Sequence, residues 1–236
     1  MGFCFSACTP GRRRWRYRGC PFGQLFCSAI MTSNPGNWIG SWCGMLNIIN
    51  GTAQQLSSEL IAGLGLFRYK IFVEKMGWPL KCEVGLESDE FDRDDTYYVI
   101  ARDKAGHVCG CARMLTTSNN YLLEQIFPGL MGDIPLPKSN DIWELSRFAV
   151  NSEGADASTS GHWLDTCRLM KQVVLVAKRH NVKRLIAFSA VGNERLLRRM
   201  GADVHRVSCA QLIDGKPVLA FWIEINEQTI SALSAY

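Results

Sequence analysis

The 236-residue chain lacks any run of about 18 consecutive apolar residues, so the sequence predicts no membrane-spanning helix. It also has little net charge. Its 26 basic and 22 acidic side chains leave +4, which is too small to indicate a nucleic-acid-binding protein. With 47% hydrophobic and 20% charged residues, the sequence instead predicts one main domain with a sizeable core, and we expect a soluble, cytoplasmic protein.

Cysteine, in contrast, is abundant. Ten are present, and five of them precede the first periodic segment (Cys4, Cys8, Cys20, Cys27, Cys43). The others lie mostly in strand or helix patterns, where a buried thiol behaves as a small hydrophobe, and this favours a reducing compartment. Cys109-x-Cys111 resembles a metal-ligand pair, but no second pair has zinc-like spacing, so we expect no metal site.

The first 44 residues differ in composition from the rest. They contain a basic run at Arg12–Arg16 and show neither helical nor strand periodicity. We expect residues 1–44 to be a poorly structured N-terminal extension and residues 45–236 to form one domain. A mis-assigned start would explain the extension, with Met45 or Met31 as the first residue.

From there on, helical and strand patterns alternate. The predicted helices are 53–75, 121–127, 160–180 and 193–200, and the predicted strands are 96–103, 107–115, 141–150, 183–189 and 216–225. Thr52-x-x-Gln55 has the form of a capping box for the first helix, and Gly77 ends it. The order predicts an α/β fold with three layers, in which a mixed, mainly antiparallel sheet carries helices on both faces.

Two opposite charges interrupt the apolar strand 141–150. Glu144 and Arg147 lie three residues apart, so in a regular strand their side chains would point to opposite faces. Either a bulge redirects one of them, or one faces a cleft while the other braces the back of the sheet. Buried charges of this kind often mark a functional site.

Two further clusters lie upstream. Arg68 and Phe72 share a helix face, and Trp78 follows just past the helix end. Aromatic residues at such positions usually belong to the core, but an aromatic face beside a guanidinium also suits a ligand with a cation and a carboxylate. The second cluster is the acidic loop Glu87-x-Asp89-x2-Asp92. Such loops are usually only solvated, yet Arg68 and Arg113 would need counter-charges inside a cleft.

In this order, the clusters resemble the LuxI-type acyl-homoserine lactone synthase family over residues 45 to 225. The resemblance implies an acyltransferase (GNAT-like) architecture. It implies that an acyl chain passes from acyl carrier protein to the amine of S-adenosylmethionine. The product then closes to a lactone, methylthioadenosine leaves, and a quorum-sensing signal results. S-adenosylmethionine is a substrate here, so no cofactor is expected.

The resemblance also assigns roles to residues. The implied catalytic residues are Glu144, Arg147 and Asp89, and the implied S-adenosylmethionine-binding residues are Arg68, Phe72, Trp78, Asp92, Arg113 and Phe127. Amide formation needs a neutral amine, and Glu144 is the candidate proton acceptor. Backbone N–H groups freed by a bulge would stabilise the oxyanion. Lactone closure needs only confinement, which the aromatic rings would supply.

The carrier protein is acidic, so we expect it to dock on basic residues, namely Lys178, Arg179, Arg195, Arg198 and Arg199, although such runs are as often merely solvated. We expect the acyl tail between the sheet and helix 160–180, along residues 185–190. Ala187 stands where family members with 3-oxo chains tend to have Thr, which favours unsubstituted chains. The alternative is a generic GNAT-type N-acyltransferase using acyl-CoA, but segment 107–115 lacks the glycine-rich pyrophosphate loop.

Overall fold

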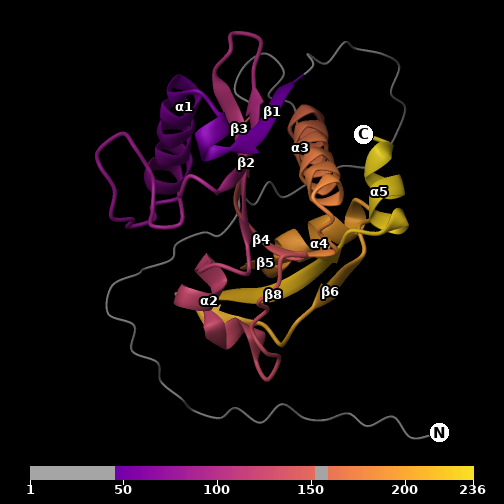
Figure 1. The fold of residues 1–236 in the computed structure, drawn as a ribbon. Coiled ribbons are helices and arrows are strands. Elements are labelled where there is room, and N and C mark those ends of the chain that lie inside the picture. The colour runs from indigo at the N-terminus through magenta and orange to yellow at the C-terminus, as the bar shows by residue number, and fades with distance from the viewer. Residues whose placement is uncertain (1–45, 152–158) are drawn as a thin grey trace, which may run out of the picture.

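The structure, a computed structural model, describes residues 46–151 and 159–236 (Figure 1). The expectation for residues 1–44, and the choice between Met31 and Met45 as first residue, lie outside these ranges. The strands are β1 (Asn47–Thr52), β2 (Tyr97–Arg102), β3 (Val108–Thr116), β4 (Ile142–Val150), β5 (Arg184–Ala190), β6 (Val204–Arg206), β7 (Gln211–Ile213) and β8 (Lys216–Glu224). The α-helices are α1 (Ser58–Arg68), α2 (Leu122–Ile126), α3 (Thr159–Arg179), α4 (Val191–Arg199) and α5 (Glu227–Ser234).

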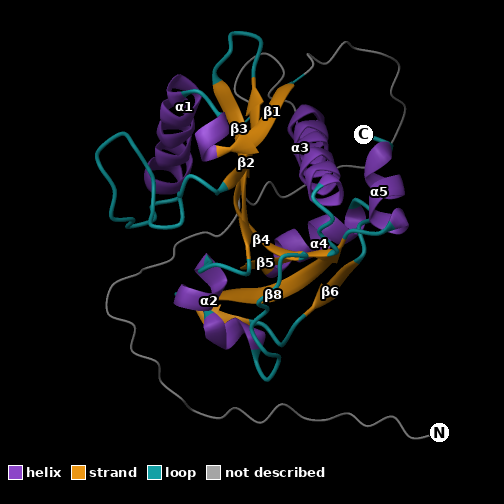
Figure 2. Cartoon of the chain, viewed as in Figure 1, coloured by secondary structure: helices purple, strands orange, loops and turns teal. Residues whose placement is uncertain are grey.

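One sheet contains all of these strands (Figure 2). Its order is β1-β2-β3-β4-β5-β8-β6, and β7 pairs with β8. Only β4 and β5 are parallel, so the sheet is mixed and mainly antiparallel, as the sequence predicts. The last pair between β4 and β5 joins Leu145 to Ala187, although the two strands continue to Val150 and Ala190. Beyond that pair the two strands separate, and their backbones no longer pair with each other.

Helices cover both faces of the sheet, which confirms the expected three layers. On one face, the apolar stripe of α3 buries Cys167, Met170, Val174 and Ala177 in a core shared with α4 and α5. These positions recur every three or four residues and therefore lie on one side of the helix. On the other face, α1 and α2 contribute to a second core. No helix in the described ranges is both long and apolar enough to cross a membrane.

The start of the first helix differs from the prediction. Residues 47–52 form edge strand β1, a 3-10 turn follows at Ala53–Gln55, and α1 begins only at Ser58. Gln55 Oε1 does accept a hydrogen bond from the Thr52 N–H (2.9 Å), but this pair caps the 3-10 turn. The N-cap of α1 is Ser57, whose side chain accepts from the Leu60 N–H at 3.2 Å. The N–H groups of Ala53 and Gln54 donate to the carbonyls of Thr96 and Asp94, and these contacts hold the segment before Ser57 out of the predicted helix.

Candidate active site

A bulge in β4 decides where its charged side chains point. The pairing between β3 and β4 shifts between Cys111 and Arg113, so that Arg147 and Phe148 together face one residue of β3. Arg147 has a φ of 50°, in the left-handed region that non-glycine residues rarely adopt. Phe148 consequently packs in the core under α3, while Arg147 points to the opposite face, which it shares with Glu144. Of the two arrangements that the spacing of these charges left open, the structure contains the bulge.

On that opposite face, three arginines and three carboxylates form one network: Arg68, Arg113 and Arg147 with Glu87, Asp89 and Asp92. Arg68, at the end of α1, is only 2% exposed. Its Nη1 and Nη2 donate to the two carboxylate oxygens of Asp92 at 2.8 and 2.9 Å, and its Nε donates to Glu87. Two parallel charge-assisted bonds fix both position and orientation of the guanidinium.

Arg113 extends from the middle of β3 and is fully buried. Its Nε donates to the Ser146 hydroxyl at 3.1 Å, and its Nη1 donates to Asp89 and, at 3.1 Å, to Asp92. Its Nη2 is buried without a hydrogen-bond partner in the described parts of the chain. A buried donor in this condition is costly, so it is available to a substrate group that reaches it.

Arg147 connects the ionic network to two aromatic rings. Its Nη2 donates to Glu87 at 3.0 Å and to Asp89 at 2.7 Å. Its guanidinium carbon lies 5.6 Å from the centroid of the Phe72 ring and 5.7 Å from that of Trp78. The two rings are stacked, with centroids 4.8 Å apart. The site therefore combines cations, carboxylates and aromatic faces within one buried cluster.

The aromatic pair owes its position to an irregular helix end. Residues Tyr69–Lys75 continue α1 as a π-helical turn, a distortion that is frequent at functional sites. Gly77, at a φ of 70°, then reverses the chain, and the Trp78 N–H donates to the Phe72 carbonyl at 2.9 Å. A residue with a Cβ is disfavoured at this φ, which explains the glycine before Trp78.

The ion pairs keep the two aspartates charged. Burial alone would raise the pKa of Asp92, but Arg68 and Arg113 reverse this effect and hold its pKa well below the usual range. Asp89 is similar: burial opposes ionisation, and the charges of Arg113 and Arg147 lower its pKa on balance. The Tyr98 hydroxyl also donates to Asp92 at 2.6 Å. The aspartates are thus stable anions around which cationic groups gather.

Glu144 lies on the same face but forms no salt bridge with any cationic side chain in residues 46–151 or 159–236. It is fully buried, and its Oε2 accepts the N–H of Leu123 at the start of α2, at 2.6 Å. Its Oε1 is buried without a hydrogen-bond partner among the described residues. Burial raises the pKa of Glu144, while the Leu123 N–H and Arg113 act in the opposite direction. The carboxylate is therefore more basic than an exposed one and retains a free acceptor oxygen.

The structure brings together seven of the residues predicted for the site: Arg68, Phe72, Trp78, Asp89, Asp92, Arg113 and Arg147. The Phe127 ring lies 5.1 Å from that of Phe188 of β5, centroid to centroid, and packs against the core that also contains Phe72 and Trp78. Glu87 is 1% exposed and connects Arg68 to Arg147, a central position that the sequence analysis did not assign to it. Its place as the first acid of the loop motif was the available signal.

The basic residues predicted for docking do not form one surface. Lys178 and Arg179 end α3, where they approach Glu227 and Asn50. Arg199 lies with its guanidinium carbon 5.7 Å from the ring centroid of Trp163, near the start of α3. Trp163 and Arg179 are sixteen residues apart, which is about 24 Å along a helix. The two clusters therefore lie at opposite ends of α3.

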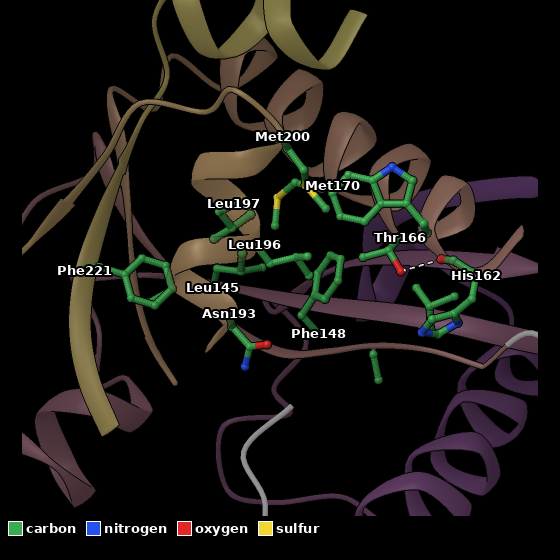
Figure 3. Close-up of a pocket in the computed structure, with 14 residues that line it drawn as sticks. Leu145, Phe148, His162, Thr166, Met170, Asn193, Leu196, Leu197, Met200 and Phe221 are labelled. Carbon is green, nitrogen blue, oxygen red and sulfur yellow. Dashed lines mark hydrogen bonds between the residues drawn. The ribbon is translucent and has the colours of Figure 1, made fainter. Parts of the chain in front are cut away.

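A largely apolar pocket opens on the α3 face of the sheet (Figure 3). It is lined by residues of β4, β5, α3, α4 and β8, among them Phe148, Ala187, Met170, Leu197 and Phe221. This is the position where the sequence analysis places an acyl tail. The α4 residues Arg195, Arg198 and Arg199 are on a helix that lines the pocket, whereas Lys178 and Arg179 are remote from it.

A sheet that opens between two parallel strands, with an apolar pocket on one face and a buried charged site on the other, is an arrangement suited to acyl transfer. The model of the autoinducer synthase family matches residues 53–233. An acyl-homoserine-lactone synthase from Ralstonia solanacearum is 42% identical over 182 residues, which cover 76% of this chain and 89% of the relative. The chain belongs to the autoinducer synthase family, and it is an acyltransferase of the acyl-homoserine-lactone synthase type.

Solved structures agree with this assignment. The crystal structure of TofI in a ternary complex with an inhibitor and MTA is 39% identical and aligns with a TM-score of 0.69, covering 79% of this chain and 96% of that chain. An acyl-CoA N-acyltransferase from Pseudomonas aeruginosa aligns with a TM-score of 0.52 at 17% identity, over 75% of this chain and 99% of that chain. The latter likeness concerns the fold alone, and it confirms the predicted acyltransferase architecture.

Proposed function

We propose that the enzyme transfers an acyl chain from acyl carrier protein to the amine of S-adenosylmethionine, closes the lactone and releases methylthioadenosine. The observation that carries this proposal is the arrangement of two sites across one sheet. The charged cluster lies on the α1 face and the apolar pocket on the α3 face, and both adjoin β4 where it separates from β5 beyond Leu145. An amine held on one face can meet a thioester that enters from the other through this opening.

The charged cluster offers complementary groups for each part of S-adenosylmethionine. Asp89 has the most exposed side chain of the three carboxylates, at 21% compared with 11% for Asp92 and 1% for Glu87, so it is the anion that a substrate ammonium can reach. Arg147 is the most exposed of the three arginines and is suited to the substrate carboxylate. Phe72 and Trp78 present aromatic faces that attract a sulfonium. The crystal structure of the similar protein TofI contains MTA, which supports S-adenosylmethionine as the substrate, because the proposed reaction releases methylthioadenosine.

Glu144 is the proposed proton acceptor. An α-ammonium group loses its proton at a pKa of about 7.7–8.0, and an ordinary glutamate accepts one at about 4.3. Burial raises the pKa of Glu144 and so narrows this gap, which makes proton transfer from the ammonium less unfavourable. The unpartnered Oε1 is the oxygen that would receive the proton, directly or through one water molecule.

The remaining steps depend on geometry. Beyond Leu145 the backbone of β4 is no longer paired with β5, so we propose that its N–H groups donate to the oxyanion that forms on the thioester carbonyl oxygen. Lactone closure then requires the methionine carboxylate to attack its own Cγ and expel methylthioadenosine. The sulfonium is already a good leaving group, so confinement of the chain between the rings and the arginines suffices.

We propose acyl carrier protein as the acyl donor because of the positive charge beside the pocket. The fold itself admits coenzyme A thioesters, as the Pseudomonas aeruginosa enzyme shows. Here, however, exposed arginines on α4 flank the acyl pocket, which suits an acidic carrier protein. Arg198 is held by the buried Glu194, which leaves Arg195 and Arg199 as the contacts most free to meet a partner.

The test uses purified full-length enzyme with S-adenosylmethionine and matched acyl chains on either acyl carrier protein or coenzyme A. Methylthioadenosine and the organic extract are quantified by mass spectrometry. We expect both methylthioadenosine and acyl-homoserine lactone, with a higher kcat/KM for the carrier-bound chain. Product formation with coenzyme A alone would replace the proposed donor, and acylation of other amines without lactone would favour the generic N-acyltransferase.

A further inference from the structure

One wall of the apolar pocket is formed by a side chain that also contacts a basic residue of α4. Trp163 of α3 lines the pocket and is only partly buried. The guanidinium carbon of Arg199 lies 5.7 Å from its ring centroid, and the ring of Tyr236 meets it edge-on, with centroids 6.2 Å apart. The indole is thus held from outside the pocket by a cation and by a second ring.

The arginines of α4 differ in what they can influence. Leu196 and Met200 line the pocket, and Arg199 lies between them on the helix at the border of that face. Arg198 instead pairs with the buried Glu194, and Arg195 is exposed on the part of the helix turned to solvent. Only Arg199 of these three contacts a pocket-lining ring among the described residues.

We propose that Trp163 is the residue that limits the length of the acyl chain, and that Arg199 is a positioning residue that holds the Trp163 ring against the pocket. This inference rests on the proposed function, in which the pocket holds the acyl tail. Three other large lining side chains, those of Phe148, Met170 and Leu197, are nine-tenths or more buried and packed in the core. Trp163 is a large lining residue whose ring contacts the exposed Arg199, so its position responds to what Arg199 contacts.

The strength of the cation–π contact between Arg199 and Trp163 sets the expected change in the ratio of lactone products. An exposed cation–π contact changes the population of one ring position by about two- to fivefold. Loss of the Arg199 guanidinium should therefore raise the ratio of long-chain to medium-chain lactone by about two- to fivefold. Removal of the indole should raise this ratio further, because the wall is then absent in every molecule.

The experiment supplies the full-length enzyme with S-adenosylmethionine and an equimolar mixture of short-, medium- and long-chain acyl carrier proteins. The ratio of the lactones formed is measured by mass spectrometry, and because the chains compete in one tube this ratio is independent of the amount of folded enzyme. The variants are Trp163→Ala, Trp163→Phe, Arg199→Ala and Arg195→Ala. The last removes the same charge from the same helix without touching the ring.

We expect Trp163→Ala and Arg199→Ala to shift the products toward longer chains, and Trp163→Phe to shift them less. Arg195→Ala should raise the KM for the carrier protein and leave the ratio unchanged. An unchanged ratio in both Trp163 variants would overturn the inference. Equal ratios in Arg199→Ala and Arg195→Ala would remove the role of Arg199. If the wild-type enzyme makes no lactone from any chain, the proposed function has failed instead, so the two failures are distinct.

Discussion

Substitution of Glu144 separates two explanations for a buried carboxylate. As a catalytic base, it takes a proton through the unpartnered Oε1. As a structural anchor, it caps α2 through the 2.6 Å hydrogen bond from the Leu123 N–H. Glu144→Gln retains an oxygen that can accept from Leu123 but cannot act as a base. Glu144→Ala removes both functions.

The expected magnitudes differ in rate and in stability. Loss of a positioned base lowers kcat by about 10²- to 10⁴-fold, and both variants should show this loss. Glu144→Ala also leaves the buried Leu123 N–H unpaired, which costs about 1–3 kcal/mol of unfolding free energy. Glu144→Gln should unfold at the wild-type denaturant concentration or above it, because it no longer buries a charge.

The contribution of Glu144 to the free energy of unfolding should depend on pH, and the direction of this dependence follows from its raised pKa. Burial raises the pKa of Glu144 in the folded protein above its unfolded value of about 4.3. The stability that this residue contributes is therefore complete below that unfolded value and declines as pH rises through the folded pKa. Glu144→Gln should lack this decline, which urea unfolding at a series of pH values from mildly acidic to neutral would measure.

The assay for the chemical step is single-turnover release of methylthioadenosine at saturating substrates, which isolates kcat from binding. A Glu144→Gln enzyme with nearly wild-type turnover would refute the role as a base. If Glu144→Ala were then both inactive and destabilised, the residue would be an anchor for α2.

Three further variants, with four expected outcomes, test the same structure. Asp92→Asn removes the carboxylate that accepts two hydrogen bonds from the buried Arg68. The free energy of unfolding, measured by urea titration, should fall by about 3–5 kcal/mol. A loss below about 1 kcal/mol would mean that the ionic network does not stabilise the fold. The aspartate pKa is held low, so stability present above the unfolded value of about 3.9 is lost as pH falls below it, and Asp92→Asn should weaken this acid sensitivity. Trp78→Leu should raise the Kd for S-adenosylmethionine, measured by calorimetry, by about two- to thirtyfold. The control is Trp222→Leu, because the Trp222 ring contacts Arg184 outside the site, and this variant should leave the Kd unchanged. Equal effects of the two substitutions would exclude a specific role for Trp78. Substitution of both Arg195 and Arg199 by Glu should raise the KM for the carrier-bound acyl chain and leave S-adenosylmethionine binding intact. Unchanged kinetics would remove the docking assignment. Arg198 is left in place because a carboxylate at that position would face the buried Glu194.

Local patterns were sufficient for most of the fold. The periodic stripe of α3 and the alternating strands around Gly106 predicted elements to within one or two residues of their observed bounds. Strand β1 was missed because Asn47, Asn50 and Gly51 have low strand propensity, and only pairing with β2 makes the segment extended. The short strands β6 and β7 and helix α5 were missed for a similar reason, since they depend on contacts with β8 and α3.

The sequence predicted which residues form the site but not which of them contact one another. The spacing of Glu144 and Arg147 left two arrangements open, a bulge or one charge on each face of the sheet, and the structure contains the bulge at Arg147. The sequence did not indicate that Glu144 would meet the Leu123 N–H, and for Glu87 it offered only a place in the acidic loop motif, because these contacts join segments far apart in the chain. The separation of the two basic clusters was equally hidden, since it arises from the length of α3.

The central claim is that the opening between β4 and β5 joins a nucleotide site on one face of the sheet to an acyl pocket on the other. A crystal structure with S-adenosylmethionine and a non-reactive acyl chain on its carrier tests this most directly. The account predicts the nucleotide against Trp78 and Arg147, the tail beside Trp163, and the amine about 3–3.5 Å from the acyl carbonyl at the opening. A nucleotide remote from Trp78 and Arg147, or a tail on the same face as the arginines, would contradict it.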